Sequence, residues 1–351
     1  MARGSGAIAG AGSRRREGSA WAVNLVVSFR RPSATLDGDV AAMGAVQRPR
    51  LSWLQAVARV CALAGSISLV ACGGETVVTP RVQAGRVGNQ IVFSSARHGT
   101  FDLHVMHADG SGQRSITAQA AISQHGDFSP DGFDLAFMSN RTGTYQVYVV
   151  GTTGTGLVQL TSGGGANGYP RWSPDGTRVL FTSFRDRNFE LYVMRADGAN
   201  QTRLTINGGD DLGGAWSPDG SRIAFVSERD GVRELFVMRA DGSAVTRLTS
   251  DGTEKGARVV WSPDGALLAF HAYRGATADI YVMNADGSQL TAVTTHASND
   301  RYPVWSPDGA RIAFSSDRDG DEEIYVVHAD GTGLRRLTTS PGPDIPDAWI
   351  R

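Results

Sequence analysis

The repetitive part of this 351-residue chain contains no cysteine. The sequence has two cysteines, Cys61 and Cys72, and both precede the repeats described below. Disulfide bonds, cysteine-based metal sites and thiol nucleophiles are therefore excluded from the repeats. About 265 residues of repeat can be held together by an apolar core alone.

Patterns that signal catalysis or metal binding are also scarce. The seven histidines are scattered, and no spacing predicts that three or four of them converge on a zinc ion. The sequence has no Gly-x-Ser-x-Gly nucleophile elbow and no phosphate-binding loop. We therefore expect no metal and no cofactor.

Residues 72–351 have no excess of positive charge. Residues 1–71 hold nine of the 34 Lys and Arg residues and three of the 35 Asp and Glu residues. Residues 72–351 consequently carry 25 basic and 32 acidic residues, a net charge of −7. An acidic domain binds nucleic acid poorly, so we expect no nucleic-acid partner.

What the sequence does contain is a motif that recurs at a fixed period. Trp-Ser-Pro-Asp-Gly stands at 172–176, 216–220, 261–265 and 305–309, and Phe-Ser-Pro-Asp-Gly at 128–132. Successive copies begin 44 or 45 residues apart, and Trp349 lies another 44 residues after Trp305. A period of about 40–45 residues with one aromatic and turn signature per unit is typical of a β-propeller.

The unit at 305–338 predicts how each repeat folds. A short apolar strand ends at Trp305, and Ser-Pro-Asp-Gly then favours a tight turn. Alternating or β-rich runs at 311–315, 323–327 and 334–338 predict three further strands, separated by two more turns. Four strands joined by three turns make one propeller blade.

The first and last units are incomplete in a complementary way. The strand at 91–93 has no Trp strand before it, and the strand at 347–350 has no strands after it. We therefore predict an all-β fold, a six-bladed β-propeller of four-stranded blades, whose ring is closed by the C-terminal strand in the first blade. Such closure removes the exposed sheet edges. We expect a monomeric propeller.

These repeats resemble the PD40 (WD40-like Pro-Asp) repeats of the TolB-type six-bladed propellers. The matched pattern is Trp-Ser-Pro-Asp-Gly, Ile-Ala-Phe, Ser-x-Arg-Asp-Gly, Leu/Ile-Tyr-Val-Met, Ala-Asp-Gly and Leu-Thr, and it covers roughly 88–351. TolB carries an α/β domain ahead of its propeller, and no such domain fits this sequence. The chain is thus similar to a lipoprotein form without that domain. The resemblance implies periplasmic protein partners, such as a peptidoglycan-associated lipoprotein.

The residues before the repeats resemble a bacterial lipoprotein leader. Arg48 and Arg50 supply a basic region, an apolar stretch follows at 60–70, and Leu69-Val70-Ala71-Cys72 resembles a lipobox. A signal peptide that starts at Met43 places this cysteine at a normal distance from its start. An ordinary membrane anchor or a cleaved secretory signal is the alternative interpretation.

This interpretation divides the chain into four segments. They are a disordered or untranslated segment (1–42), a lipoprotein signal peptide (43–71), a tether (72–87) and the propeller (88–351). Lipidation at Cys72 would attach the protein to the membrane of the cell envelope, at the outer membrane or the periplasmic face.

Aspartates of the repeated turns form one conserved-looking set within the repeats. They are Asp109, Asp131, Asp175, Asp197, Asp219, Asp241, Asp264, Asp286, Asp308 and Asp330. Because they recur in every unit, we expect them to accept local backbone hydrogen bonds in turns rather than to form one active site.

The connections between units vary, and variable loops on a rigid scaffold are where binding sites tend to lie. We expect a polar, acidic and aromatic ring at one mouth of the central channel. Its candidate residues are Asp211, Asp300, Asp344, Asn167, Tyr169, Tyr302, His125 and His296. Such a ring suits a sugar, a peptide end or a cation. The alternative is that these residues cap the blade ends and solvate the channel.

Two functions follow as hypotheses. The first is a non-enzymatic binding or scaffold module, lipid-anchored in the bacterial envelope, whose partner is an envelope protein, a peptide or a glycan. The second is a propeller glycan lyase or hydrolase that uses His125, His296, Asp211 or Asp300 at the channel mouth. The second requires these four side chains to converge.

Overall fold

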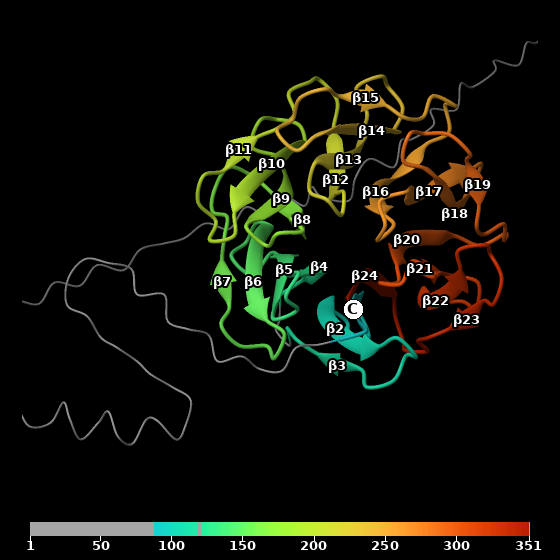
Figure 1. Ribbon diagram of the computed structural model, residues 1–351. Coiled ribbons are helices and arrows are strands. Elements are labelled where there is room, and N and C mark those ends of the chain that lie inside the picture. The colour runs from blue at the N-terminus through green and yellow to red at the C-terminus, as the bar shows by residue number, and fades with distance from the viewer. Residues whose placement is uncertain (1–87, 118–120, 351) are drawn as a thin grey trace, which may run out of the picture. The chain divides into compact units, whose positions relative to one another are not determined.

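The computed structural model describes residues 88–117 and 121–350. The predicted leader segments 1–42 and 43–71, the tether 72–87 and the lipidation site Cys72 lie outside the described residues, so these boundaries stay predictions. The described residues form six four-stranded antiparallel sheets arranged in a ring (Figure 1). The predicted six-bladed propeller is confirmed.

The strands of each blade follow one another from the ring axis outward. Blade 1 contains β24 (Asp344–Ile350), β1 (Gln90–Ser95), β2 (Asp102–His107) and β3 (Arg114–Ser115). Blade 2 contains β4 (Ser123–Phe128), β5 (Asp134–Ser139), β6 (Gln146–Gly151) and β7 (Val158–Gln159). Blade 3 contains β8 (Asn167–Trp172), β9 (Arg178–Ser183), β10 (Glu190–Arg195) and β11 (Thr202–Arg203).

The remaining three blades repeat this order. Blade 4 contains β12 (Asp211–Trp216), β13 (Arg222–Ser227), β14 (Glu234–Arg239) and β15 (Thr246–Arg247). Blade 5 contains β16 (Lys255–Trp261), β17 (Leu267–Arg274), β18 (Thr277–Asn284) and β19 (Thr291–Ala292). Blade 6 contains β20 (Asp300–Trp305), β21 (Arg311–Ser316), β22 (Glu323–His328) and β23 (Arg335–Arg336).

Ring closure occurs where the sequence predicts it. Strand β24 pairs antiparallel with β1, with Trp349 opposite Ile91 and Ile345 opposite Ser94. The indole Nε1 of Trp349 also donates a hydrogen bond to Asn89 Oδ1, at 3.1 Å. The last strand of the chain is therefore the innermost strand of blade 1, and its pairing leaves β1 without a free edge.

Apolar side chains fill the space between neighbouring blades. Each second strand contributes one completely buried phenylalanine, and the six are Phe93, Phe137, Phe181, Phe225, Phe270 and Phe314. Trp261 of blade 5 packs with Val226 and Leu235 of blade 4, so the innermost tryptophan joins two blades. Burying each large apolar side chain contributes about 1.5–3 kcal/mol, and this repeated core replaces the missing disulfides.

The recurrent turns owe their shape to local hydrogen bonds. In blade 4 the Ser217 hydroxyl donates to Asp219 Oδ1 at 2.5 Å, and the Ser221 N–H donates to the same oxygen at 3.0 Å. Every turn aspartate named above accepts the backbone N–H two residues later. The Ser217 hydroxyl bond lowers the pKa of Asp219 to about 2. Their predicted role as turn residues is confirmed.

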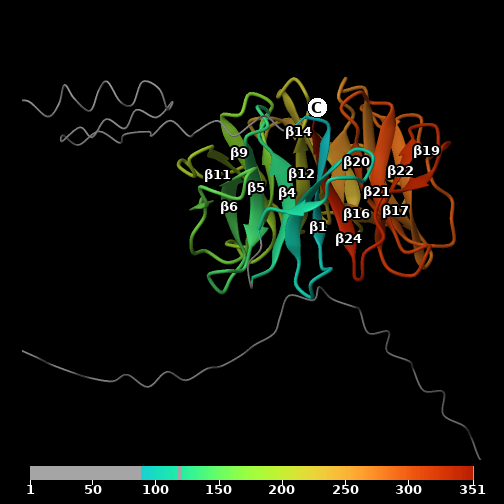
Figure 2. The ribbon, with the colours of Figure 1, turned by 90° about the horizontal axis from the view of Figure 1, so that it is seen from below.

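The ring has two faces, which Figure 2 shows from the side. The strands run roughly along the ring axis, so all turns and connections gather at its two ends. We call the end with the Ser-Pro-Asp-Gly turns the Pro face. The opposite end, with the Ser-x-Arg turns and the blade-to-blade connections, is the loop face. Within the described ranges, no helix is long and apolar enough to cross a membrane.

Candidate functional site

The innermost strands β4, β8, β12, β16, β20 and β24 surround the ring axis (Figure 1). Each is bulged against the second strand of its blade. In β4, β8 and β20 the bulge places His125, Tyr169 and Tyr302 in the left-handed backbone region, with φ of 57°, 52° and 57°. Bulges redirect side chains, so one repeated irregularity sets the orientation of three predicted binding residues.

The bulge imposes a strict requirement on β12. Gly213 occupies the corresponding position with φ of 58°. A Cβ atom at Gly213 would overlap the backbone carbonyl of Ala257 in the next blade. Only glycine therefore allows the inner strands of blades 4 and 5 to approach this closely.

Four of the predicted binding residues are almost completely buried at the loop-face end of the inner strands: Asn167, Asp211, Asp300 and Asp344. Each accepts a hydrogen bond from the arginine of the Ser-x-Arg turn in its own blade. The nitrogen-to-oxygen distances are 3.1 Å for Arg185 and Asn167, 3.2 Å for Arg229 and Asp211, 2.9 Å for Arg318 and Asp300, and 2.8 Å for Arg97 and Asp344. These side chains fasten the blade ends, which is the alternative role that the sequence left open.

The fastening arginine has two further partners. In blade 4, Arg229 Nε donates to Ser227 Oγ at 2.8 Å, and the guanidinium lies 4.7 Å from the centre of the Phe236 ring. We call this set of serine, arginine and inner-strand residue the blade clamp. Cation–π contacts of this kind add about 0.5–2 kcal/mol. Burial raises the pKa of Asp211, and the bond from Ser227 and the Arg229 charge oppose that shift.

Blade 5 lacks the clamp. Ala272 replaces the serine, and Lys255, the only lysine in the sequence, stands opposite it where Asp211 stands in blade 4. The Lys255 ammonium is completely buried and pairs with Glu234 Oε2 at 3.2 Å and with Asp251. The extra residue in β16 explains why one repeat is 45 residues long.

The aromatic members of the predicted ring lie closer to the axis. The His125 imidazole stacks on the Tyr169 ring with 4.3 Å between centres. Tyr302 meets His271 edge to face at 5.3 Å. Burial raises the pKa of both Tyr169 and Tyr302, so both hydroxyls stay protonated at neutral pH. Their hydroxyl groups can donate or accept hydrogen bonds to a ligand.

His296 does not join this group. Its side chain is exposed in the connection between blades 5 and 6, where Nδ1 lies 3.0 Å from Ser298 Oγ. Asp211 and Asp300 are held in the clamps of different blades. In residues 88–117 and 121–350, no three His, Cys, Asp or Glu side chains are placed to hold a metal ion. The convergence required by the lyase or hydrolase hypothesis is not found.

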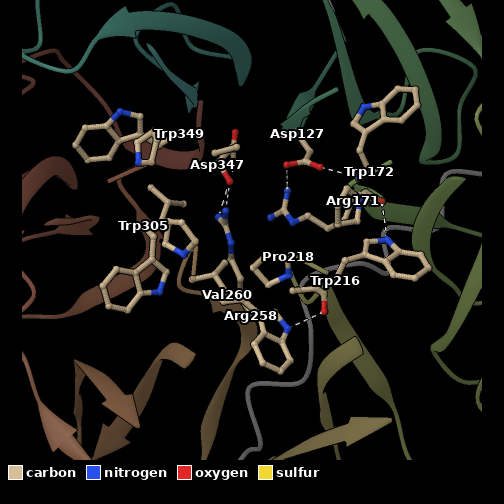
Figure 3. Close-up of a pocket in the computed structure, with 17 residues that line it drawn as sticks. Asp127, Arg171, Trp172, Trp216, Pro218, Arg258, Val260, Trp305, Asp347 and Trp349 are labelled. Atoms are coloured by element: carbon tan, nitrogen blue, oxygen red, sulfur yellow. Dashed lines mark hydrogen bonds and ion pairs between the residues drawn. The ribbon is translucent and has the colours of Figure 1, made fainter. Parts of the chain in front are cut away.

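A cavity of about 330 Å³ opens on the axis at the Pro face (Figure 3). Its walls are the tryptophans that end the inner strands and the prolines of the following turns. These residues are Trp172, Trp216, Trp261, Trp305, Trp349, Pro174, Pro218, Pro263 and Pro307. Pro174, Pro218 and Pro263 are exposed at the rim, so the cavity is open to solvent.

Four charged side chains line this apolar cavity. Arg171 Nη1 lies 3.8 Å from Asp127 Oδ1, and Arg258 Nη1 lies 4.0 Å from Asp347 Oδ1. Both distances exceed hydrogen-bond length, in contrast to the blade clamps. Figure 3 shows each arginine extending across the opening toward its aspartate. Burial, followed by the charge of Arg171, lowers the pKa of Arg258 to about 9.

The carboxylates are partly engaged elsewhere. Asp127 Oδ2 accepts the Trp172 backbone N–H at 2.7 Å. Asp347 Oδ2 accepts the Ser94 hydroxyl at 2.6 Å, whereas Asp347 Oδ1 is buried and has no hydrogen-bond partner. Burial raises the pKa of Asp127, and the Arg171 charge opposes the shift.

His125 connects the cavity with the aromatic group nearer the loop face. Its Nδ1 lies 3.6 Å from Asp347 Oδ1, and its backbone N–H donates to Ser94 Oγ at 3.2 Å. Burial lowers the pKa of His125, although Asp347 opposes the shift. The imidazole is therefore neutral at pH 7. His125 thus contacts both Asp347 of the cavity and Tyr169 of the aromatic group.

Asp127, Arg171 and Asp347 were not among the site residues predicted from the sequence. A signal for each of them is present. The residue just before the conserved aromatic is Ala or Val in four units, but Asp127 and Arg171 in the other two. A charge where other units carry a small apolar residue marks a difference between blades. Asp347 stands out in the same way, because the residue two positions before the aromatic is Gly, Pro or Val in the other five units.

Comparison with known proteins identifies a family and solved structures that share this fold. The PD40 family, described as the TolB beta propeller domain, matches residues 64–168, 155–260 and 255–348. TolB from Acinetobacter baumannii is 24% identical with a TM-score of 0.68, and the match covers 75% of this chain and 66% of that one. This chain thus spans just under two thirds of the length of that protein. No curated protein matches the sequence.

Other solved structures share the architecture. A putative TolB from Agrobacterium tumefaciens has a TM-score of 0.61 and 20% identity, covering 74% of this chain and 98% of that one. An oligogalacturonate lyase from Vibrio parahaemolyticus has a TM-score of 0.50 and 17% identity, covering 72% and 73%. At these identities the similarity shows the fold alone. The family match covers most of the chain, which therefore belongs to the PD40 family of TolB-type β-propeller domains.

Proposed function

We propose that this protein is a non-enzymatic binding or scaffold module of the bacterial envelope, and that its ligand, a protein, peptide or glycan, enters the axial cavity. The observation that carries the proposal is the cavity itself. Its walls are mainly tryptophan and proline rings, and buried Arg258 and Asp347 each have a polar atom without a hydrogen-bond partner. Pockets that combine apolar walls with a few convergent polar groups are typical ligand sites.

The aromatic group nearer the loop face is a second contact surface in this proposal. Tyr169 and Tyr302 are half-buried beside the axis, and His125 supports Tyr169 by stacking. Tyrosine combines a large apolar ring with a hydroxyl and is favoured at interfaces. Asn167, Asp211, Asp300 and Asp344 support the blade ends and are not proposed as ligand contacts, and His296 lies apart in an exposed loop.

A binding role is favoured over catalysis because the proposed catalytic set is dispersed. His125 is buried beside Asp347, His296 is exposed in a loop, and Asp300 is paired with Arg318. General acid–base chemistry needs a donor and an acceptor within hydrogen-bond reach of the same substrate atom. The geometry gives no such pair among the predicted residues.

We further propose that lipidation at Cys72 attaches the propeller to the envelope, with the periplasm or the cell exterior as its compartment. The lipobox-like Leu69-Val70-Ala71-Cys72 supports this. Asn89 is hydrogen-bonded to Trp349, so the first described residues lie on the Pro face, the face of the cavity. Two or more acyl chains are needed for stable attachment.

Affinity capture from envelope extract tests the binding role. The full-length lipidated chain is compared with a cavity variant, Arg171→Gln with Arg258→Gln, and with a loop-face variant, Tyr169→Ala with Tyr302→Ala. Arg239→Gln is the matched control, because Arg239 is exposed and does not line the cavity. A specific protein or glycan should be retained by wild type and the control and lost by the cavity variant. Equal retention by all four proteins would refute the proposed site.

The anchor is tested by metabolic labelling with a radioactive fatty acid. Cys72→Ala should abolish labelling and release the protein from the membrane fraction. Cys61→Ala removes the other cysteine and should do neither. Labelling of the Cys72→Ala protein would contradict lipidation at this residue.

A further inference from the structure

The two arginines of the axial cavity are incompletely satisfied. Arg258 donates to the backbone carbonyls of Pro346 and Asp347, and its Nε is buried without a partner. Arg171 donates one long bond, 3.4 Å, to the carbonyl of Pro170. A guanidinium has five N–H donors. Both groups therefore retain unused donors at the cavity.

The two guanidinium charges are not neutralised in close ion pairs. Each lies at 3.8–4.0 Å from its nearest cavity aspartate, and each aspartate already accepts a hydrogen bond from Trp172 or Ser94. Burial lowers the pKa of Arg258, and the positive charge of Arg171 lowers it further. An anion placed between the guanidinium groups would relieve this repulsion in a desolvated site.

We propose that the axial cavity binds a single carboxylate of a peptide ligand and holds it between Arg171 and Arg258; this inference rests on the proposed function. Apolar side chains next to the carboxylate would pack against the tryptophan and proline walls. Charge-assisted bonds from arginine to a carboxylate are among the strongest in proteins and fix its orientation. The cavity thereby defines the chemistry of its partner.

The other charges of the site limit the anion to a monoanion. Asp127 and Asp347 line the same cavity, and a dianionic phosphate would face both carboxylates. A carboxylate carries one charge and matches the planar guanidinium. If inorganic phosphate alone binds between Arg171 and Arg258, the proposal is overturned.

The walls favour a peptide over an acidic sugar. Trp216 Nε1 and Trp261 Nε1 already donate to the carbonyls of Arg171 and Ala215, and proline rings have no donor. Trp172 Nε1 and Trp305 Nε1 have no partner but are buried, so they are not exposed to a ligand. A uronate would bring hydroxyl groups on several sides into contact with these carbon surfaces. Buried hydroxyl groups without partners cost about 1–3 kcal/mol each, whereas an aliphatic or aromatic side chain loses nothing there.

Calorimetric titration of the full chain at low salt tests the proposal with five probes. They are N-acetyl-Ala-Leu as the free acid, its carboxamide, N-acetyl-Ala-Glu-Leu carboxamide, inorganic phosphate and trigalacturonate. The free acid tests a chain-terminal carboxylate, and the glutamate peptide tests a side-chain carboxylate. At least one of these two should bind, roughly tenfold or more tightly than the carboxamide, because a bond to a charged group is lost.

Substitutions show which residues bind the carboxylate. Arg171→Gln and Arg258→Gln should each weaken binding of the carboxylate peptide roughly tenfold or more, whereas Arg239→Gln, at an exposed position away from the cavity, should leave it unchanged. Arg171 is the more accessible of the two, so Arg171→Gln carries the test if the Arg258 variant unfolds in a thermal melt. The position of the bound peptide is measured by ¹⁹F NMR of protein labelled with 5-fluorotryptophan. Five of the seven tryptophans line the cavity, so their signals should shift when the peptide binds there.

The proposal is overturned if neither carboxylate peptide binds better than the carboxamide, if Arg171→Gln has no effect, or if phosphate or trigalacturonate binds more tightly. These outcomes are distinct from failure of the proposed function. If the cavity variant loses its envelope partner but carboxylate peptides show no preference, the binding role stands and only the ligand chemistry is wrong. If no partner is captured and no probe binds, both fail.

Discussion

The guanidinium of Arg318 lies 2.9 Å from both carboxylate oxygens of Asp300, two residues that are 18 positions apart in one blade. Asp300 is completely buried, and Arg318 is 12% exposed. The same arginine donates to Ser316 Oγ at 2.9 Å and lies 4.9 Å from the centre of the Tyr325 ring. This clamp ties the start of an inner strand to the hairpin turn beside it.

Loss of this carboxylate should destabilise the propeller. Asp300→Ala leaves the Arg318 charge without its partner, and we expect the free energy of unfolding to fall by roughly 2–3 kcal/mol. This is less than the cost of breaking a completely buried pair, because Arg318 reaches solvent. Urea unfolding followed by circular dichroism measures it. Asp321→Ala, at an exposed position of the same turn, should change the free energy by less than about 0.5 kcal/mol.

The same variant separates structure from binding. At a temperature where Asp300→Ala is folded, it should retain the envelope partner that wild type captures, because Asp300 does not line the cavity. Specific loss of the partner by the folded variant would restore Asp300 to the binding site.

His271 makes stability depend on pH in mild acid. Burial, followed by the charge of Arg301, lowers the pKa of His271 from 6.5 to about 3. Below pH 6.5 the unfolded chain binds a proton at this imidazole and the folded chain does not, so stability falls as pH falls toward 3. Between pH 6.5 and 4.5 the loss from this one group should be roughly 2–3 kcal/mol.

Chemical unfolding at several pH values measures this effect. His271→Gln should reduce the decline between pH 6.5 and 4.5, whatever its effect on stability at pH 7. His296→Gln removes an exposed histidine and should keep the wild-type pH dependence. Parallel pH curves for wild type and His271→Gln would show that the buried imidazole is not responsible.

Glycine substitutions distinguish a steric requirement from a conformational one. Gly213 and Gly231 both have positive φ, 58° and 88°, but only Gly213 has a neighbouring backbone that a Cβ would overlap. Gly231→Ala should cost about 1–2 kcal/mol for the left-handed backbone. Gly213→Ala should cost more, since the inner strand of blade 5 must also move. Thermal unfolding compares the two, and equal losses would argue against close packing at Gly213.

Removal of the closing strand should abolish cooperative folding. A chain that ends at Pro343 leaves β1 as an exposed edge and removes Trp349 and Ile345 from the core. We expect aggregation or a broad thermal transition, because an unpaired edge strand recruits other chains. A chain that ends at Ile350 keeps β24 and is the control. A monomeric, sharply melting 1–343 protein would contradict closure by β24.

Much of the fold could be predicted because it is encoded locally. The Ser-Pro-Asp-Gly turns use hydrogen bonds within five residues, as Ser217 and Asp219 show. Their 44-residue spacing gave the number of blades, and the incomplete first and last units gave the closure. The sequence also shows that one repeat is a residue longer than the others. That this repeat places Lys255 where other blades have an acid follows only from the register of β16 with β17.

The candidate site was only partly predictable. The bulged aromatic residues at the axis could be found from their distance to the conserved tryptophan. The buried acids Asp211, Asp300 and Asp344 were predicted as ligand contacts, and the structure pairs each of them with an arginine of its own blade. The constant spacing of 18 residues between Asp211 and Arg229, and between Asp300 and Arg318, was a usable signal for a structural pair.

By itself, the sequence determined the blade, the number of blades and the strand that closes the ring, because turn chemistry and alternation act over a few residues and repeat with a fixed period. Only the tertiary structure decided which charges share the axis. Asp127, Arg171, Arg258 and Asp347 come from four different blades. They meet because closing the ring brings the inner strands around one line, and no local interaction along the chain encodes that convergence.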